Sequence, residues 1–116
     1  MSKTTTQMDI EELLPHLDMM SNLMYQLSES WFGDTVDHQD PRHFIIALTG
    51  EWGEFCNAWK KIDRRDDIDH DGAQWTIGQE IADVLIYLLI LSRVLGIDLG
   101  WHMFEKLTQN LERFGK

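Results

Sequence analysis

The sequence predicts an all-α fold, a four-helix bundle formed by a single domain over residues 1–116. Apolar residues recur three and four positions apart, which is the spacing of one helical face. No segment alternates apolar and polar residues between turn signals, so no strand is expected. Hydrophobic residues make up 43% of the chain, which predicts an ordered core despite a net charge of -10. The four helices are expected over residues 9–31, 41–62, 76–96 and 98–114.

The first two helices carry apolar stripes and start signals. Asp9 is a candidate cap of the first helix, and Pro15 is expected to kink its second turn. The second helix opens with Asp40 as N-cap and Pro41 at the first helical position, a favoured combination at a helix start. Its predicted inner face carries Phe44, Leu48, Trp52, Phe55 and Trp59.

The third and fourth helices are expected to pack as antiparallel neighbours. Thr76 and Gln79 have capping-box spacing, and Gly96 is a natural residue to end a helix. The third helix is apolar nearly all round, so we expect it to be the buried one. The fourth follows a short link and is capped by Asp98. Short links favour a bundle, and residues 63–75 form the one long predicted loop.

Charge, hydropathy and cysteine content limit the possible classes of protein. The acid excess disfavours nucleic acid and anionic membranes as partners, because both would repel the chain. The longest apolar run, residues 84–91, is too short to span a bilayer, and no basic-then-apolar leader opens the sequence. Cys56 is the single cysteine, so no intrachain disulfide is possible and a reducing compartment is expected. These features predict a cytoplasmic protein.

Two acidic side chains interrupt the apolar stretch EIADVLIYLLIL. Glu80 and Asp83 are three apart, so they share one helical face, and no Lys or Arg lies within a turn upstream. Carboxylates in apolar surroundings need a partner, because an isolated buried charge costs several kcal/mol. Arg93 lies too far along the helix to satisfy both. A divalent cation is the simplest partner.

A second acidic pair, Glu51 and Glu54, has the same spacing in GEWGEF on the preceding helix. If the two helices pack together, four carboxylates converge, and hard oxygen ligands suit Mg²⁺ or Mn²⁺ rather than zinc. Gly50 and Gly53 flank this pair, and glycine inside a helix suggests close approach of a neighbour.

The last helix supplies the opposite charge. Lys106, Asn110 and Arg113 lie on one face at i, i+4 and i+7. A point charge, an amide donor and a forked guanidinium are what a polyphosphate requires. Four basic residues near the end of the second helix are candidates for further phosphate contacts: Lys60, Lys61, Arg64 and Arg65.

Taken together, these motifs resemble a known family. A Glu-x-x-Glu pair, a variable loop, a Glu-x-x-Asp pair and a Lys, Asn and Arg helix are the pattern of the all-α nucleoside triphosphate pyrophosphatases, the MazG-like superfamily. The segments HQDPRHFIIALTGEWGE and EIADVLIYL look like those of its dCTP pyrophosphatase branch. The resemblance covers residues 38–113, about two thirds of the chain.

The resemblance implies a function, a cofactor and an assembly. It implies hydrolysis of a nucleoside triphosphate to the monophosphate and pyrophosphate, with dCTP as the first candidate and dGTP, dATP or dUTP as others, in nucleotide-pool control. It further implies homodimers or homotetramers with sites near subunit interfaces. Glu51 or Glu54 is expected to act as general base, and we favour Glu54. The implied Mg²⁺ ligands are Glu51, Glu54, Glu80 and Asp83; the implied phosphate-binding residues are Lys60, Lys106, Asn110 and Arg113; the implied nucleoside-binding residues are His38, Trp59 and Tyr87.

Two other classes of function fit parts of the sequence. Residues 67–72, DIDHDG, match the opening of an EF-hand loop, but the twelfth position is Gly78 where a bidentate Glu is needed. A non-catalytic acidic helical bundle that binds a basic partner is the other alternative. Metal-dependent stabilisation separates it from an enzyme, because an adaptor has no reason to melt higher with Mg²⁺.

Overall fold

The structure is a computed structural model that describes residues 5–64 and 70–115. Within that part of the chain every regular element is a helix and no strand occurs, so the all-α prediction is confirmed. None of the described helices is long and apolar enough to cross a membrane. The elements are α1 (Thr5–Leu13), α2 (Pro15–Phe32), α3 (Pro41–Asp63), α4 (His70–Val94) and α5 (Leu99–Phe114).

The predicted first helix is in fact two helices, α1 and α2, which meet at Pro15. Proline has no N–H, so the bond back to the carbonyl of Glu11 is missing and the helix is interrupted. Leu14 itself keeps helical angles, with φ −63° and ψ −33°. Because α1 begins at Thr5, Asp9 lies inside it, and the prediction of Asp9 as a cap is wrong.

The predicted starts of α3 and α5 are confirmed. Asp40 has an extended backbone, and its side chain accepts a hydrogen bond from the Arg42 N–H at 3.0 Å, with Pro41 in the first turn. Asp98 does the same for α5 by accepting from the Trp101 N–H at 3.0 Å. In both cases the carboxylate satisfies an N–H that has no partner within the helix.

Helix α4 begins at His70, earlier than predicted. Thr76 is not a cap, because its hydroxyl donates to the Gly72 carbonyl at 3.0 Å from inside the helix. The predicted end of α4 is confirmed. Gly96 has φ +69°, and the Ile97 N–H donates to the Ser92 carbonyl at 2.9 Å, the hydrogen bond that closes a left-handed helix terminus.

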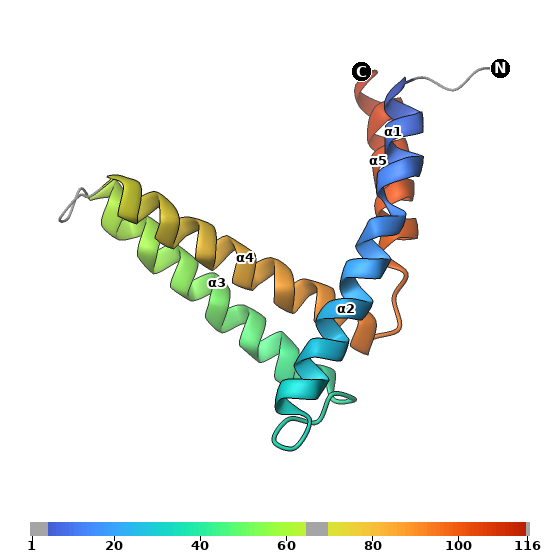
Figure 1. Cartoon of the computed structure of the whole chain (residues 1–116). Coiled ribbons are helices and arrows are strands. Elements are labelled where there is room, and N and C mark those ends of the chain that lie inside the picture. The colour runs from blue at the N-terminus through green and yellow to red at the C-terminus, as the bar shows by residue number, and fades with distance from the viewer. Residues whose placement is uncertain (1–4, 65–69, 116) are drawn as a thin grey trace.

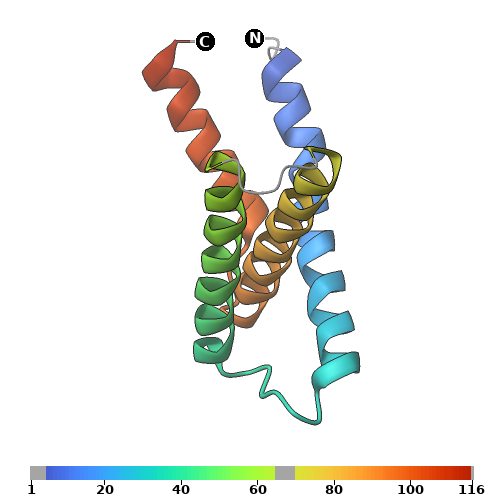
Figure 2. The same cartoon turned by 90° about the vertical axis from the view of Figure 1, so that its left-hand side faces the viewer.

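The helices form two arms rather than a closed bundle (Figure 1). One arm consists of α3 and α4, and the other consists of α1, α2 and α5. Helices α3 and α4 pack along one another as an antiparallel pair, and α2 crosses the C-terminal part of α4. Helix α5 packs mainly on α2, and Figure 2 shows α1 and α5 separating toward their outer ends. The radius of gyration is 17.6 Å, against about 13 Å for a compact domain of 100 residues. A single chain therefore does not close the four-helix bundle that the sequence predicts.

The open shape leaves a small core. Phe44, Leu89 and Ile90 are the buried hydrophobic residues of the described chain. Helix α4 was expected to be buried all round, yet Ile81 is 53% exposed and Leu85 is 44% exposed. That expectation is wrong for the single chain, because α4 is covered only where α2 and α3 contact it.

Candidate metal centre and phosphate-binding residues

Packing of α3 against α4 brings three of the predicted ligands together. Glu51, Glu54 and Glu80 each offer a carboxylate oxygen, and these atoms all lie within 4.8 Å of one another. We refer to these three residues as the carboxylate cluster. Glu51 and Glu80 are half-buried, whereas Glu54 is exposed and faces solvent from the same turn of α3. The cluster thus has two covered ligands and one open one.

The covered carboxylates are electrostatically strained. Burial raises the pKa of Glu51, and the neighbouring charges of Glu54 and Asp83 raise it further. Burial also raises the pKa of Glu80, followed by the same two charges. The charged groups that shift both residues are all carboxylates. In this protein the cluster therefore repels itself unless a proton or a cation joins it.

The cluster fits a divalent cation. Oε2 of Glu51 and Oε2 of Glu80 are buried and have no hydrogen-bond partner within the described chain. A buried acceptor without a partner costs free energy, and buried polar atoms normally have one. Oxygen atoms at this spacing are the ligands that Mg²⁺ prefers. The fourth predicted ligand, Asp83, lies outside the group of atoms within 4.8 Å, yet its charge acts on both Glu51 and Glu80.

Tyr87 lies beside the carboxylate cluster. Burial raises the pKa of its phenol, and the charges of Glu51, Asp83 and Glu54 add to the effect. The residue is half-buried one turn beyond Asp83 on α4. The phenol therefore lies within the electrostatic influence of the cluster, and a nucleoside-binding role for Tyr87 stays a prediction.

His38 is a buried residue in the link between α2 and α3. One ring nitrogen, Nε2, lies 2.8 Å from Ser28 Oγ, and the other, Nδ1, lies 3.1 Å from the Val36 carbonyl oxygen. The ring packs between Tyr25 and Phe44, at centroid distances of 5.7 and 5.4 Å. Both nitrogens thus have partners inside the protein, and a nucleoside-binding role for His38 stays a prediction.

The predicted inner face of α3 is only partly covered. Phe44 is buried near the start of the helix, whereas Trp52 and Trp59 are 55% and 53% exposed. Trp52 stacks on Phe55 with ring centroids 5.1 Å apart. Trp59 therefore presents an open aromatic surface on the helix that carries Glu51 and Glu54.

The glycines beside the first acidic pair do not mark a close approach. A Cβ built on Gly50 or Gly53 meets no atom of the described chain within 4 Å. The prediction of a close neighbour is therefore wrong for the single chain.

Three of the four predicted phosphate-binding residues lie on a different arm from the carboxylate cluster. Lys106, Asn110 and Arg113 are exposed on α5, in the arm that diverges from α3 and α4 (Figure 1). Lys60 is exposed in the last turn of α3, the helix that also carries two cluster residues. The remaining basic candidates are Lys61, which is exposed, Arg64, which is the C-cap of α3, and Arg65, which lies outside the described residues.

The calcium-loop alternative does not fit the structure. Helix α4 begins at His70 and runs through Gly78, the twelfth position of the supposed EF-hand loop. Residues 67–69 lie outside the described residues. A chain that is helical over positions 4 to 12 cannot wrap a cation as that loop does.

Comparison with known proteins agrees with the motifs. The chain is similar to dCTP pyrophosphatase 1 of Mus musculus and of Rattus norvegicus, at 29% identity over 89 residues in each case. Each alignment covers 70% of this chain and 49% of the relative, so the chain spans about half the length of these curated relatives. No protein-family model matches the chain. No solved structure matches it.

Proposed function

We propose that this protein is a Mg²⁺-dependent nucleoside triphosphate pyrophosphohydrolase, which converts a nucleoside triphosphate and water to the monophosphate and pyrophosphate. The observation that carries the proposal is the carboxylate cluster, with two covered oxygens that lack a partner. The similarity to dCTP pyrophosphatase 1 supports the substrate class and makes dCTP the first nucleotide to test, before dGTP, dATP and dUTP. The proposed role is control of the nucleotide pool in the cytoplasm.

Glu51, Glu54 and Glu80 would hold the cation. Asp83, whose charge acts on Glu51 and Glu80, is the proposed fourth ligand. When bound, Mg²⁺ neutralises triphosphate charge and lowers the pKa of a bound water. Glu54 is exposed at the open side of the cluster, so it is the carboxylate best placed to accept a proton from a water that attacks the α-phosphorus. Mn²⁺ is expected to substitute, because it takes the same hard oxygen ligands.

The basic residues would hold the phosphates. Lys106 supplies a point charge, Asn110 an amide donor and Arg113 a fork for two oxygens, while Lys60 approaches from α3. Tyr87 lies beside the carboxylate cluster, and Trp59 offers an aromatic face to a base. His38 is proposed to support nucleoside binding indirectly, by holding the link between α2 and α3 in place.

We propose that the active form is a homodimer or homotetramer. The exposed apolar side chains of α4, including Ile81 and Leu85, are candidates for a contact with a second copy, because exposed apolar surface often marks an interface. In addition, α5 and the carboxylate cluster lie on different arms of one chain. A second copy that covers α4 would bury this apolar surface. It would also bring the basic side chains of α5 in one chain to the carboxylate cluster of another.

A panel of substrates tests the proposal. Release of pyrophosphate is measured for each deoxynucleoside and ribonucleoside triphosphate with Mg²⁺, for the natural protein, for a Glu80→Gln and Asp83→Asn double variant, and for Glu12→Gln. Glu12 is an exposed carboxylate of α1 and serves as the charge control. We expect cleavage of at least one nucleotide, loss of about 100-fold or more in the double variant, and no change in the control. If no nucleotide is cleaved and Mg²⁺ does not stabilise the protein, the alternative function, a non-catalytic acidic bundle that binds a basic partner, becomes the better-supported hypothesis.

A further inference from the structure

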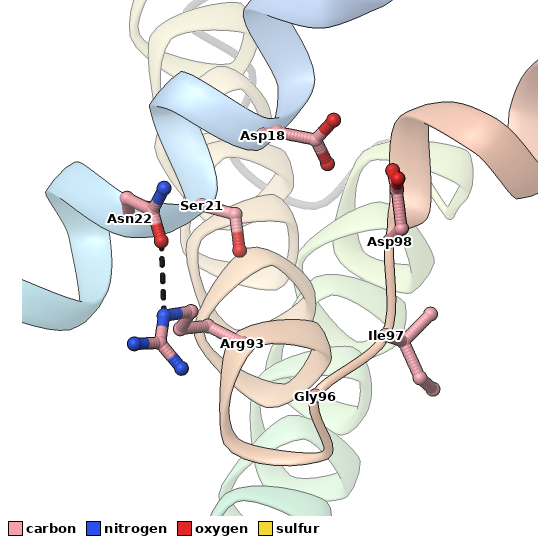
Figure 3. A pocket seen from close by; sticks show the side chains of 7 residues that line it. All are labelled: Asp18, Ser21, Asn22, Arg93, Gly96, Ile97 and Asp98. Carbon is pink, nitrogen blue, oxygen red and sulfur yellow. Dashed lines mark hydrogen bonds between the residues drawn. The ribbon is translucent and has the colours of Figure 1, made fainter.

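One face of α2 joins the two arms of the molecule. Asp18, Ser21 and Asn22 are spaced i, i+3 and i+4, so their side chains leave α2 on the same side (Figure 3). The Ser21 hydroxyl is buried and donates to the Leu89 carbonyl at 2.6 Å. The Arg93 Nε donates to Asn22 Oδ1 at 2.9 Å. Two of the three residues therefore attach α2 to α4.

The third residue, Asp18, attaches α2 to α5. Its Oδ1 accepts a hydrogen bond from the Gly100 N–H at 3.2 Å. Gly100 is buried, and a Cβ at that position would lie 2.8 Å from Asp18 Oδ2 and 3.0 Å from the Leu14 carbonyl oxygen. A side chain at position 100 would therefore require Asp18 or the Leu14 carbonyl to shift, so glycine suits this close contact. Leu14 lies where α1 gives way to α2, at the Pro15 interruption.

Asp18 also suits the electrostatics of this contact. Asp98 already satisfies the Trp101 N–H in the first turn of α5. Asp18 satisfies a second N–H of that turn from another helix. Both carboxylates lie at the positive end of the helix dipole, where negative charge is favoured. Figure 3 shows the Asp18 side chain extending from α2 toward the beginning of α5.

The rest of α5 has little to hold it in place. It packs mainly on α2, and its outer end separates from α1 (Figure 2). A cavity of about 360 Å³, bordered by Asp18, Arg93 and Asp98, lies beside the link from α4 to α5. Arg113 is about 20 Å along the helix from Gly100, at 1.5 Å per residue. A tilt of about 10° at Gly100 would therefore move Arg113 by about 3 Å.

We infer that Asp18 is a positioning residue, which fixes the direction of α5 through Gly100 and so determines where Lys106, Asn110 and Arg113 lie. The inference rests on the proposed function for its catalytic consequence, because those side chains are the proposed phosphate contacts. The inference assigns Asp18 no contact with substrate. Its effect reaches the reaction through the position of α5.

Kinetics of matched variants give the first test. Asp18→Ala removes the acceptor, and Gly100→Ala crowds Asp18 and the Leu14 carbonyl at the contact. Asp9→Asn removes an exposed acid of α1 and serves as the charge control. We expect kcat/KM to fall about tenfold or more in the first two variants, mainly through KM, since a shift of about 1 Å can cost about 100-fold. Asp18→Asn keeps an oxygen acceptor, so it should recover part of the loss. The melting rise with Mg²⁺ should stay unchanged, because the carboxylate cluster lies on the other arm.

A distance measurement tests the inference without any activity. Cys56 is the single cysteine and is exposed on α3, and Gln109 is exposed on α5. Spin labels on Cys56 and on a Gln109→Cys variant, diluted with unlabelled protein, report the distance between the arms. We expect Asp18→Ala and Gly100→Ala to shift or broaden the distance distribution, and Asp9→Asn to leave it unchanged. An unchanged distribution in the first two variants overturns the inference, whether or not a nucleotide is hydrolysed. A shifted distribution in a protein without hydrolysis upholds the positioning role and defeats the proposed function instead.

Discussion

Replacing Glu80 by glutamine should change the stability of the protein in opposite directions with and without Mg²⁺. Glutamine has the shape of glutamate without its charge, so it removes repulsion within the carboxylate cluster and one cation ligand at the same time. Without Mg²⁺, the variant should melt at or above the temperature of the natural protein, because Glu80 is covered and surrounded by like charges. With Mg²⁺, it should lose most of the rise in melting temperature.

The size of that rise follows from linkage. At a free Mg²⁺ concentration ten times the dissociation constant, binding to the folded state adds about 1.4 kcal/mol. For a chain of 116 residues, about 1 kcal/mol shifts the melting temperature by about 4 °C. The natural protein should therefore melt about 6 °C higher, and the Glu80→Gln variant should gain about 2 °C or less.

The same experiment has a defined pH dependence. The folded pKa values of Glu51 and Glu80 lie above the ordinary value of 4.5. The Mg²⁺-free native state therefore binds more protons than the unfolded state above that pH, and its stability falls as pH rises through the raised pKa values. Protons compete with Mg²⁺ for the same oxygens, so the rise with Mg²⁺ should be larger at pH 8 than at pH 5.

Differential scanning fluorimetry at fixed protein concentration measures the melting temperature without Mg²⁺, its rise with Mg²⁺ and the pH dependence of both. Glu12→Gln is the matched control on α1. An equal rise with Mg²⁺ in the natural protein and the Glu80→Gln variant would refute a cation site at the carboxylate cluster. So would a Mg²⁺-free variant that melts several degrees lower than the natural protein, because it would show that the charge of Glu80 stabilises the fold.

Three further predictions follow from the same geometry. In a Tyr25→Phe background, alkaline absorbance titration should place the midpoint of Tyr87 above 10.0. Glu51→Gln should lower that midpoint, because it removes a neighbouring negative charge. An unchanged midpoint in Glu51→Gln would contradict the proximity of the phenol to the cluster. Gly96→Ala should destabilise the protein by about 1 kcal/mol in urea unfolding because of its φ of +69°, whereas Gly78→Ala, with no atom within 4 Å in the described chain, should be neutral or stabilising. Ile81→Glu should lower the mass found by light scattering, since Ile81 is 53% exposed on the face proposed to meet a second copy; a natural protein that is already a monomer would contradict that assembly.

The sequence predicts helix starts well where a side chain makes the decisive hydrogen bond locally. Asp40 and Asp98 were predicted as caps and are confirmed as such. Thr76 was predicted as a cap because its spacing to Gln79 fits, but the same hydroxyl can bond back inside a helix, as it does to Gly72. Local sequence does not distinguish these two uses of a threonine.

Acidic spacing predicts part of the candidate site and misses the rest. Glu51 and Glu54 of α3 converge with Glu80 of α4 as expected. Positions i and i+3 share a helical face, and α3 packs on α4. The junction at Asp18 and Gly100 was not predicted, since a contact between residues 82 positions apart leaves no mark in local spacing. One signal was available: the polar residues Asp18, Ser21 and Asn22, spaced i, i+3 and i+4, interrupt the apolar residues in the N-terminal half of α2.

The closed bundle is the part of the prediction that one chain does not fulfil. Helical periodicity shows which face of α4 is apolar, and it does not show what covers that face. Leu89 and Ile90 are buried by the same chain, whereas Ile81 and Leu85 stay exposed. An intermolecular contact leaves the same pattern in a sequence as an intramolecular one.

The position of an oxygen isotope in the products tests the central claim most directly. The protein is incubated with dCTP and Mg²⁺ in water enriched in ¹⁸O, and the products are analysed by ³¹P NMR and mass spectrometry. The proposed reaction predicts one ¹⁸O atom in the monophosphate and unlabelled pyrophosphate, because water attacks the α-phosphorus. Label in pyrophosphate, or release of inorganic phosphate with a nucleoside diphosphate, would contradict it.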